Sequence, residues 1–149
     1  MDKIDLNILK CLKENSRQTA STISQTINLS VSAVIERIRK MEQKGVIQRY
    51  TVVLDEKQLG NDLTVFVSIR LEHPKYGAGF AKEVVRHPNV CECYYIAGDV
   101  DYLLKVVTDN SNNLEVVHQD IKQMPGVSWT KTLYVLSTIK NEISVLPVE

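Results

Sequence analysis

Small polar and basic side chains recur between residues 30 and 49 with a spacing suited to contacts with a polyanion. Ala33, Glu36, Arg37 and Lys40 lie three or four residues apart, which places them on one face of a helix. Guanidinium and hydroxyl groups can bind phosphates or base edges, and the Glu36 carboxylate can accept a hydrogen bond from cytosine N4. We expect Ser32, Ala33, Glu36 and Arg37 near base edges, Arg39, Lys40, Lys44 and Arg49 near phosphates, and Ser30 where the helix begins.

An amphipathic helix that follows Ser30 is expected to carry this surface. Ser30 is a good N-cap, and Gly45 stands where a helix C-terminus favours a residue that tolerates positive φ. Lys44 and Arg49, at the exit from this helix, are equally compatible with simple solvation. The apolar stripe that would pack the helix against its neighbours is Val31, Val34, Ile35, Ile38 and Met41.

A shorter helix over residues 19–27 precedes it, with Ala20, Ile23 and Ile27 on one face. Asn28 enters the left-handed region at low cost, so a tight turn can join the two helices. This arrangement is typical of a helix-turn-helix, whose second helix enters the DNA major groove. A plain helical hairpin is the alternative, and these residues alone do not separate the two. Another helix, within residues 2–15, is expected to support the pair by packing.

Charge is distributed unevenly along a chain whose formal net charge is +0. Residues 1–54 hold nine lysines and arginines against five aspartates and glutamates, a net charge of +4, and the remainder carries −4. A basic first third and an acidic remainder favour two domains, one of which binds a polyanion. Chance asymmetry in a neutral protein is the alternative.

The composition is ordinary for a globular protein, with 44% hydrophobic and 24% charged residues among 149. No apolar run approaches 18 residues, and the start of the chain does not resemble a signal peptide. Cys11, Cys91 and Cys93 form no disulfide framework pattern. We therefore expect a cytoplasmic, nucleoid-associated protein without a membrane partner.

Few residues outside the basic helix have types and spacings that suggest reaction chemistry. Cys91 and Cys93 share one side of a predicted strand, but no further cysteine or paired histidine completes a zinc pattern. His73 and His87 each precede a proline, and His118 lies on the apolar edge of a predicted helix. No Ser-His-Asp order, glycine-rich phosphate loop or close carboxylate pair stands out. We expect no catalytic residue, no metal site, no cofactor and no enzymatic activity.

Residues 63–139 alternate between strand and helix patterns. Strands are expected at 63–71, where apolar residues alternate along the chain, and at 90–97, 102–108 and 127–139. Helices are expected around 80–85 and over residues 111–121, where Ser111 is the expected N-cap. The order βαββαβ predicts a ferredoxin-like four-stranded antiparallel sheet with both helices on one face. A further strand is expected at 46–55, leading away from the helix-turn-helix. The whole chain is therefore predicted to be an α+β protein.

Several strands of the predicted sheet are apolar on both sides, although helices cover only one. In the last strand, for example, Trp129, Leu133 and Val135 lie on one side and Tyr134 and Leu136 on the other. The bare face needs a cover, and a second copy of the same domain supplies one, so we predict a homodimer with face-to-face sheets. Such a dimer would present two recognition helices to two DNA half-sites.

Four segments in order resemble the Lrp/AsnC family of prokaryotic transcriptional regulators. They are DKIDLNILKCLKENSR, LSVSAVIERIRKMEQKGVIQRY, CECYYIAGDVDYLLKV and MPGVSWTKTLYVLSTIK. The resemblance implies an N-terminal, winged-helix-like helix-turn-helix domain at 1–48, a linker strand and turn at 49–61, and a C-terminal ferredoxin-like domain of the RAM type at 62–149. It also implies dimers that assemble further, often into octamers.

The resemblance further implies an amino-acid effector bound near a glycine-aspartate turn. By position, Gly98, Asp99, Val100, Asp101 and Tyr102 are the candidate effector residues, and Arg37 matches the family's frequent arginine in the recognition helix. From the residues alone, a plain hairpin turn is the favoured interpretation of Gly98–Asp101, since glycine and aspartate are what such turns need. The chain departs from the family pattern at Ser24, at Asn28 and at Glu36, which stands where a basic residue is frequent.

We therefore predict a transcriptional regulator that binds double-stranded DNA and whose binding or assembly responds to a small effector, namely an amino acid. An architectural protein that wraps or bends DNA without an effector is the alternative. An enzyme on a ferredoxin-like fold is a weaker one, since no reactive constellation supports it.

Overall fold

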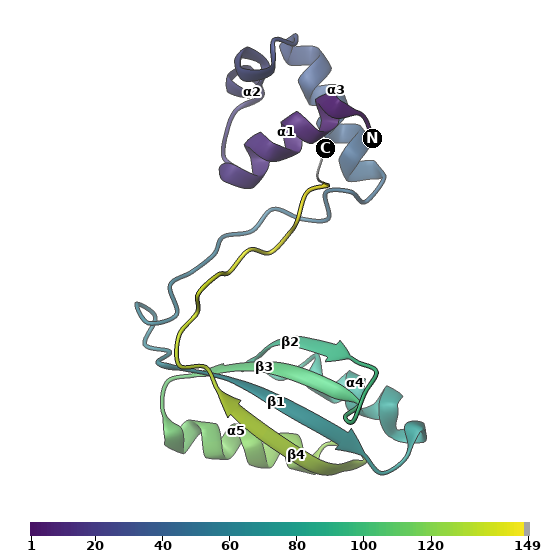
Figure 1. The fold of residues 1–149 in the computed structure, drawn as a ribbon, viewed down its shortest axis with the longest axis vertical. Helices are drawn as coiled ribbons and strands as arrows, with labels where there is room; N and C mark the ends of the chain where they lie inside the picture. The colour runs from purple at the N-terminus through teal and green to yellow at the C-terminus, as the bar shows by residue number, and fades with distance from the viewer. Residues whose placement is uncertain (148–149) are drawn as a thin grey trace. The chain divides into compact units, whose positions relative to one another are not determined.

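The computed structural model describes residues 1–147 and divides into two compact units (Figure 1). One unit comprises Met1–Val53 together with the chain end from Asn141 onward, and the other comprises Leu54–Lys140. Each unit has its own hydrophobic core. The predicted domain limits at residues 48 and 61 stay a prediction.

Three helices form the first unit: α1 (Lys3–Glu14), α2 (Ala20–Ile27) and α3 (Val31–Gln43). Side-chain caps start all three, because Asp2, Thr19 and Ser30 each accept a hydrogen bond from a backbone N–H of the first turn. The cap predicted at Ser30 is thus confirmed, with Ala33 N donating to its Oγ over 3.3 Å. The core of the unit is Ile8, Ile23, Val34 and Met41.

Two left-handed residues shape the turns on either side of α3. Asn28 has φ 54° and ψ 50° and ends α2, as its turn position predicts. Gly45, with φ 70°, follows α3, and the next amide, that of Val46, returns to the carbonyl of Met41 over 2.9 Å. These bonds fix where α3 begins and ends relative to α2.

The prediction of a strand at 46–55 is wrong. No residue from 46 to 55 is in a strand. A strand requires a ladder partner, and no other segment of the described chain pairs with these residues. The chain end also belongs to the helical unit, where Lys13 forms an ion pair with Glu142.

Four antiparallel strands and their helices form the second unit in the order βαββαβ, which confirms the predicted ferredoxin-like fold. The elements are β1 (Leu63–Leu71), the 3-10 turn η1 (Pro74–Tyr76), α4 (Gly77–Val84), β2 (Val90–Tyr95), β3 (Tyr102–Thr108), α5 (Ser111–Gln123) and β4 (Val127–Tyr134). Their order in the sheet is β2-β3-β1-β4. The two strands that adjoin in the middle, β1 and β3, are therefore those whose side chains build the core.

Both helices cover one face of this sheet (Figure 1). Alternate residues of β1, namely Val65, Val67 and Ile69, are buried against Phe80 of α4 and Ile121 of α5. The alternation predicted for β1 is confirmed. Two strands are shorter than predicted, since β2 ends at residue 95 and β4 at residue 134, where ladder pairing stops. The N-cap of α5 is Asn110 rather than the predicted Ser111.

The opposite face of the sheet is uncovered in the single chain and carries large apolar side chains. Leu133 of β4 pairs with Phe66 of β1, and Tyr94 of β2 pairs with Leu103 of β3. Leu133 is 48% exposed, Tyr94 is 50% exposed and Trp129 is 41% exposed. This is the arrangement expected of a face that a second copy covers.

Candidate nucleic-acid interface and effector turn

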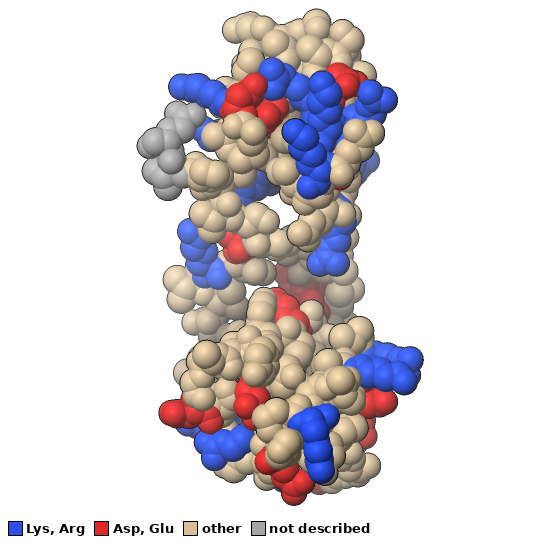
Figure 2. Space-filling model, turned by 90° about the vertical axis from the view of Figure 1, so that its right-hand side faces the viewer, with Lys and Arg blue, Asp and Glu red and all other residues tan. Residues whose placement is uncertain are grey.

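The exposed side of α3 combines basic and acidic groups in an ion-paired row. Glu36 accepts from Arg39 Nη2 at 2.7 Å and lies 3.5 Å from Lys40 Nζ, and both basic side chains are more than half exposed. Figure 2 shows that lysine and arginine side chains gather over this unit, with acidic groups among them. Because the negative charge of Glu36 offsets one of the two positive charges of Arg39 and Lys40, this surface is less positive than its basic residues suggest. Exposed pairs of this kind contribute little to stability and can exchange partners readily.

The other small and basic candidates of this surface are accessible. Ser30, Ser32, Lys44 and Arg49 are exposed, and Ala33 is half-buried. Ser30 already uses its oxygen in the cap of α3, so its hydroxyl is left with a proton to donate. The structure thus gathers the side chains of residues 30–40 on one helix, whereas Arg49 lies on the segment that leaves it.

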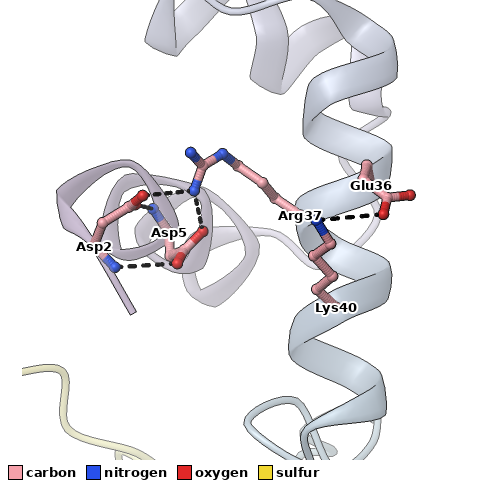
Figure 3. A network of polar contacts seen from close by, with 5 residues as sticks. All are labelled: Asp2, Asp5, Glu36, Arg37 and Lys40. Atoms are coloured by element: carbon pink, nitrogen blue, oxygen red, sulfur yellow. Dashed lines mark hydrogen bonds and ion pairs between the residues drawn. The ribbon is translucent and has the colours of Figure 1, made fainter.

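Arg37 differs from its neighbours, because its guanidinium turns toward α1 (Figure 3). Its Nη1 donates to Asp2 Oδ2 at 2.8 Å and to Asp5 Oδ1 at 2.7 Å. Hydrogen bonding to these carboxylates, first to Asp5, raises the pKa of Arg37. The pKa of Asp2 is lowered, chiefly by the hydrogen bond from the Asp5 backbone and then by Arg37. The base-edge contact predicted for Arg37 therefore stays a prediction. In this conformation the guanidinium is bonded to Asp2 and Asp5.

The Gly98–Asp101 turn lies between β2 and β3 and is anchored to β1. Arg70 of β1 donates two hydrogen bonds to the carbonyl of Asp99, from Nε at 3.1 Å and Nη2 at 2.8 Å. Asp101 Oδ2 accepts from Leu71 N at 2.7 Å, and Asp101 N donates to Ile69 O at 2.8 Å. The turn is thus held by groups some 30 positions earlier in the chain.

Tyr102 follows this turn, and its partly buried ring packs against the core. Its centroid lies 4.6 Å from that of Phe80 and 5.1 Å from that of Tyr95. Burial is the main reason why the pKa of Tyr102 is raised. Gly98, with φ 149°, and Asp99 are exposed, and Val100 is half-buried. Among the predicted effector residues, the groups most open to a ligand are therefore the Asp99 side chain and the backbone at Gly98.

Two family matches cover nearly the whole chain. Residues 1–48 match the winged helix-turn-helix DNA-binding family, and residues 64–145 match the Lrp/AsnC ligand binding domain. The chain belongs to the Lrp/AsnC family. This membership confirms the resemblance inferred from the four sequence segments.

Individual Lrp/AsnC relatives align along almost their full length. The HTH-type transcriptional regulator FL11 of Pyrococcus horikoshii is 34% identical over 149 residues, which is 100% of this chain and 97% of that protein. The leucine-responsive regulatory protein of Escherichia coli is 35% identical over 143 residues, covering 94% of this chain and 87% of that protein. A regulator of Neisseria meningitidis, solved as its L-Met complex, superposes with a TM-score of 0.92 at 28% identity, covering 98% and 96% of the two chains. The protein is thus a transcriptional regulator with a ligand-binding domain, not an enzyme.

The cysteines and the possible metal ligands of this Lrp/AsnC chain form no second site in the described residues. Cys91 and Cys93 are exposed in the single chain, and partial desolvation is the main cause that raises the pKa of both thiols, which disfavours the reactive thiolate. Within residues 1–147, no group of three or more His, Cys, Asp or Glu side chains could hold a metal ion. Among the described helices, none is long and apolar enough to cross a membrane.

Sequence reasoning missed three residues that shape the two sites: Asp2, Asp5 and Arg70. The Asp2–Asp5 spacing carries a local signal, since an acidic N-cap followed three residues later by a second carboxylate is typical of a capping box. Their bond to Arg37 has no local signal, because it joins residues 32 and 35 positions apart. Arg70 is likewise 29 positions from the carbonyl that it binds.

Proposed function

We propose that this Lrp/AsnC regulator binds specific double-stranded DNA through the exposed face of α3. Ser32, Ala33 and Glu36 would face base edges, while Arg39, Lys40, Lys44 and Arg49 would neutralise phosphates. The observation that carries the proposal is α3 itself. This helix follows the N-cap Ser30, is joined to α2 by the left-handed Asn28, and carries basic side chains on its exposed face. DNA binding places the site of action in the cytoplasm, on the nucleoid.

We infer that the small molecule bound by the second unit is an amino acid and that it binds at Gly98–Tyr102. The match to a ligand-binding domain and the L-Met complex of a relative support this inference. The exposed Gly98 backbone can approach a ligand closely, and the Asp99 carboxylate can accept from an ammonium group. Asp101 would act indirectly, because its carboxylate oxygen Oδ2 already binds Leu71 N.

We further propose a homodimer that buries the open sheet face and assembles to an octamer. Exposed Trp129, Leu133 and Tyr94 support the dimer, since large apolar side chains gathered on one surface favour association. A two-fold dimer would present two copies of α3 to two half-sites one helical turn apart.

The experiment that tests the proposal is a thermal-shift screen of the protein against the twenty amino acids, followed by DNA binding with and without any hit. An amino acid at 100 times its dissociation constant adds about 2.7 kcal/mol of stability, which is readily detected. The DNA probe is the region upstream of the protein's own coding sequence. A hit that alters DNA affinity or assembly supports an amino-acid-responsive regulator.

A second candidate function is effector-independent DNA wrapping or bending. The proposed dimer is compatible with this second function, because repeated DNA-binding units can bend a duplex without contacting many base edges. Tight DNA binding with no thermal shift from any amino acid would support this function and would make the Gly98–Tyr102 turn an assembly contact.

A further inference from the structure

The two carboxylates that bind Arg37 also cap α1, and they divide their oxygens between the two tasks. Asp2 Oδ1 accepts from Asp5 N at 2.9 Å, and Asp5 Oδ2 accepts from Asp2 N at 3.1 Å. This reciprocal capping box leaves Asp2 Oδ2 and Asp5 Oδ1, and both of these oxygens bind the same Arg37 nitrogen (Figure 3). The guanidinium is therefore bonded to the first turn of α1 through the two carboxylate oxygens that the capping box does not use.

The place of Arg37 on α3 explains why it reaches α1 and not outward. With about 100° between successive helix residues, Arg37 lies about 60° from Val34 and about 40° from Met41. Both of those residues are buried in the core of the unit. Arg39, in contrast, lies about 160° from Arg37 on the exposed side. Arg37 is accordingly at the edge of the core-facing stripe, and its side chain is 30% exposed, against 62% for Arg39.

We propose that Arg37 is a positioning residue, which through Asp2 and Asp5 fixes α3 against the start of α1 and so sets the angle at which the exposed face of α3 meets DNA. This role replaces the base contact that the sequence predicts for Arg37. The inference rests on the proposed DNA-binding function of α3.

The surroundings of the three groups suit a fixed link between helices. Asp5 is the most enclosed member, with 16% of its side chain exposed. The bonds to charged partners are 2.7 and 2.8 Å long, as expected of charge-assisted hydrogen bonds. The two carboxylates already offset the positive charge of Arg37, so a phosphate would gain less from this guanidinium than from an arginine without acidic partners.

The decisive comparison is between Arg37→Ala and Asp5→Asn, with Arg39→Ala as the matched arginine control on the exposed face. Asparagine has one acceptor oxygen, which can keep the cap at Asp2 N, and its NH2 group then meets Arg37 donor to donor. The probe is a duplex that the wild-type protein selects from a random library, and the second probe is an unselected duplex of the same length. Fluorescence anisotropy at several salt concentrations gives both affinities and the salt slope of each variant.

If Arg37 positions α3, both Arg37→Ala and Asp5→Asn weaken binding to the selected duplex by about tenfold. Binding to the unselected duplex and the salt slope stay as in the wild type. The double variant binds no worse than either single variant, because both remove the same link. Arg39→Ala, by contrast, weakens binding to both duplexes and lowers the salt slope by about one, as loss of a phosphate contact does.

Other results overturn the inference. If Arg37 contacts DNA itself, Asp5→Asn leaves binding unchanged or strengthens it, since it removes a negative charge near the polyanion, whereas Arg37→Ala still weakens it. A changed base preference in the duplexes that Arg37→Ala selects also overturns it. Circular dichroism verifies that each variant is folded, and Arg37→Lys, which keeps the charge, replaces Arg37→Ala if the latter is not. A wild-type protein that selects no duplex overturns the proposed function as well, and that outcome is distinct from the others.

Discussion

The side chain of Asp101 is bonded to the backbone of Leu71, with Oδ2 accepting from the amide over 2.7 Å. The β1–β3 ladder ends at the pair Ile69–Tyr102, so the amide of Leu71 lies just beyond the regular pairing and needs another acceptor. Asp101 supplies this partner and at the same time fixes the Gly98–Asp101 turn against the end of β1. Its anchoring role therefore accounts for an aspartate at this position without any ligand.

Asp101→Ala is expected to destabilise the sheet unit by about 1.5–3 kcal/mol, because it removes a charge-assisted hydrogen bond and leaves the Leu71 amide without that acceptor. Asp101→Asn is expected to cost less, since its amide oxygen can still accept. Denaturant unfolding followed by the fluorescence of Trp129, the single tryptophan of the chain, measures both. Equal losses in the two variants would contradict the anchoring role.

Arg70 connects the same turn to the open sheet face, since its guanidinium also lies 5.3 Å from the centre of the Trp129 ring. Arg70→Lys is expected to weaken the response to an amino-acid effector, because an ammonium group lacks the fork that makes two bonds to the Asp99 carbonyl. The thermal shift at a fixed effector concentration measures this loss. Arg86→Lys, at an exposed arginine just after α4, is the matched control, and it should leave the shift unchanged.

Gly126 is expected to tolerate alanine far less well than Gly60. Both have positive φ, 74° and 84°, so alanine at either position costs about 1–2 kcal/mol of backbone strain. A Cβ on Gly126 would also lie 2.3 Å from Cβ and Cγ of Tyr76, whereas a Cβ on Gly60 meets nothing within 4 Å. Gly126→Ala should therefore lose about 1–3 kcal/mol more than Gly60→Ala in denaturant unfolding. Similar losses at the two positions would show that Tyr76 moves aside freely.

His118 is expected to make the stability of the sheet unit depend on pH. Burial, with a smaller contribution from Lys122, lowers its pKa below the ordinary 6.5, and its Nε2 lies 3.0 Å from Thr130 Oγ1. The unfolded chain thus takes up the proton at a higher pH than the folded chain does. The contribution of His118 is complete above pH 6.5 and decreases as the pH falls below it. Unfolding by denaturant between pH 7.5 and 5.5 should show this decrease in the wild type and a smaller one in His118→Gln.

Leu133→Asp is expected to convert the proposed dimer into a monomer at micromolar concentration, because it places a charge among the apolar side chains of the open sheet face. Sedimentation velocity measures the change. Val116→Asp is the matched control, since Val116 is 56% exposed on α5, which covers the other face of the sheet. A wild-type protein that sediments as a monomer, or a dimer that persists in Leu133→Asp, would contradict the face-to-face arrangement.

The sequence by itself determined the elements and their order. Apolar periods of three to four residues predicted α3 and α5, and strict alternation predicted β1, since side chains in a helix or strand repeat at fixed intervals. Local turn chemistry likewise predicted the Ser30 cap and the left-handed Asn28 and Gly45, because these preferences depend on a few neighbouring residues. The strand predicted at 46–55 was wrong for the opposite reason: a strand also needs a partner, which propensity cannot supply.

Only the tertiary structure decided what the charged residues of the two sites contact. Arg37 and Arg39 have the same side chain two positions apart, yet one binds the capping carboxylates of α1 and the other binds Glu36. Arg70 of β1 donates to the carbonyl of Asp99, and Asp101 accepts from the amide of Leu71 in β1, so two contacts join β1 to a turn about 30 positions later. Long side chains can reach several partners, and the partner that wins is set by which segments the fold brings within about 3 Å. The spacing of residues along the chain therefore does not predict which partner a charged side chain contacts.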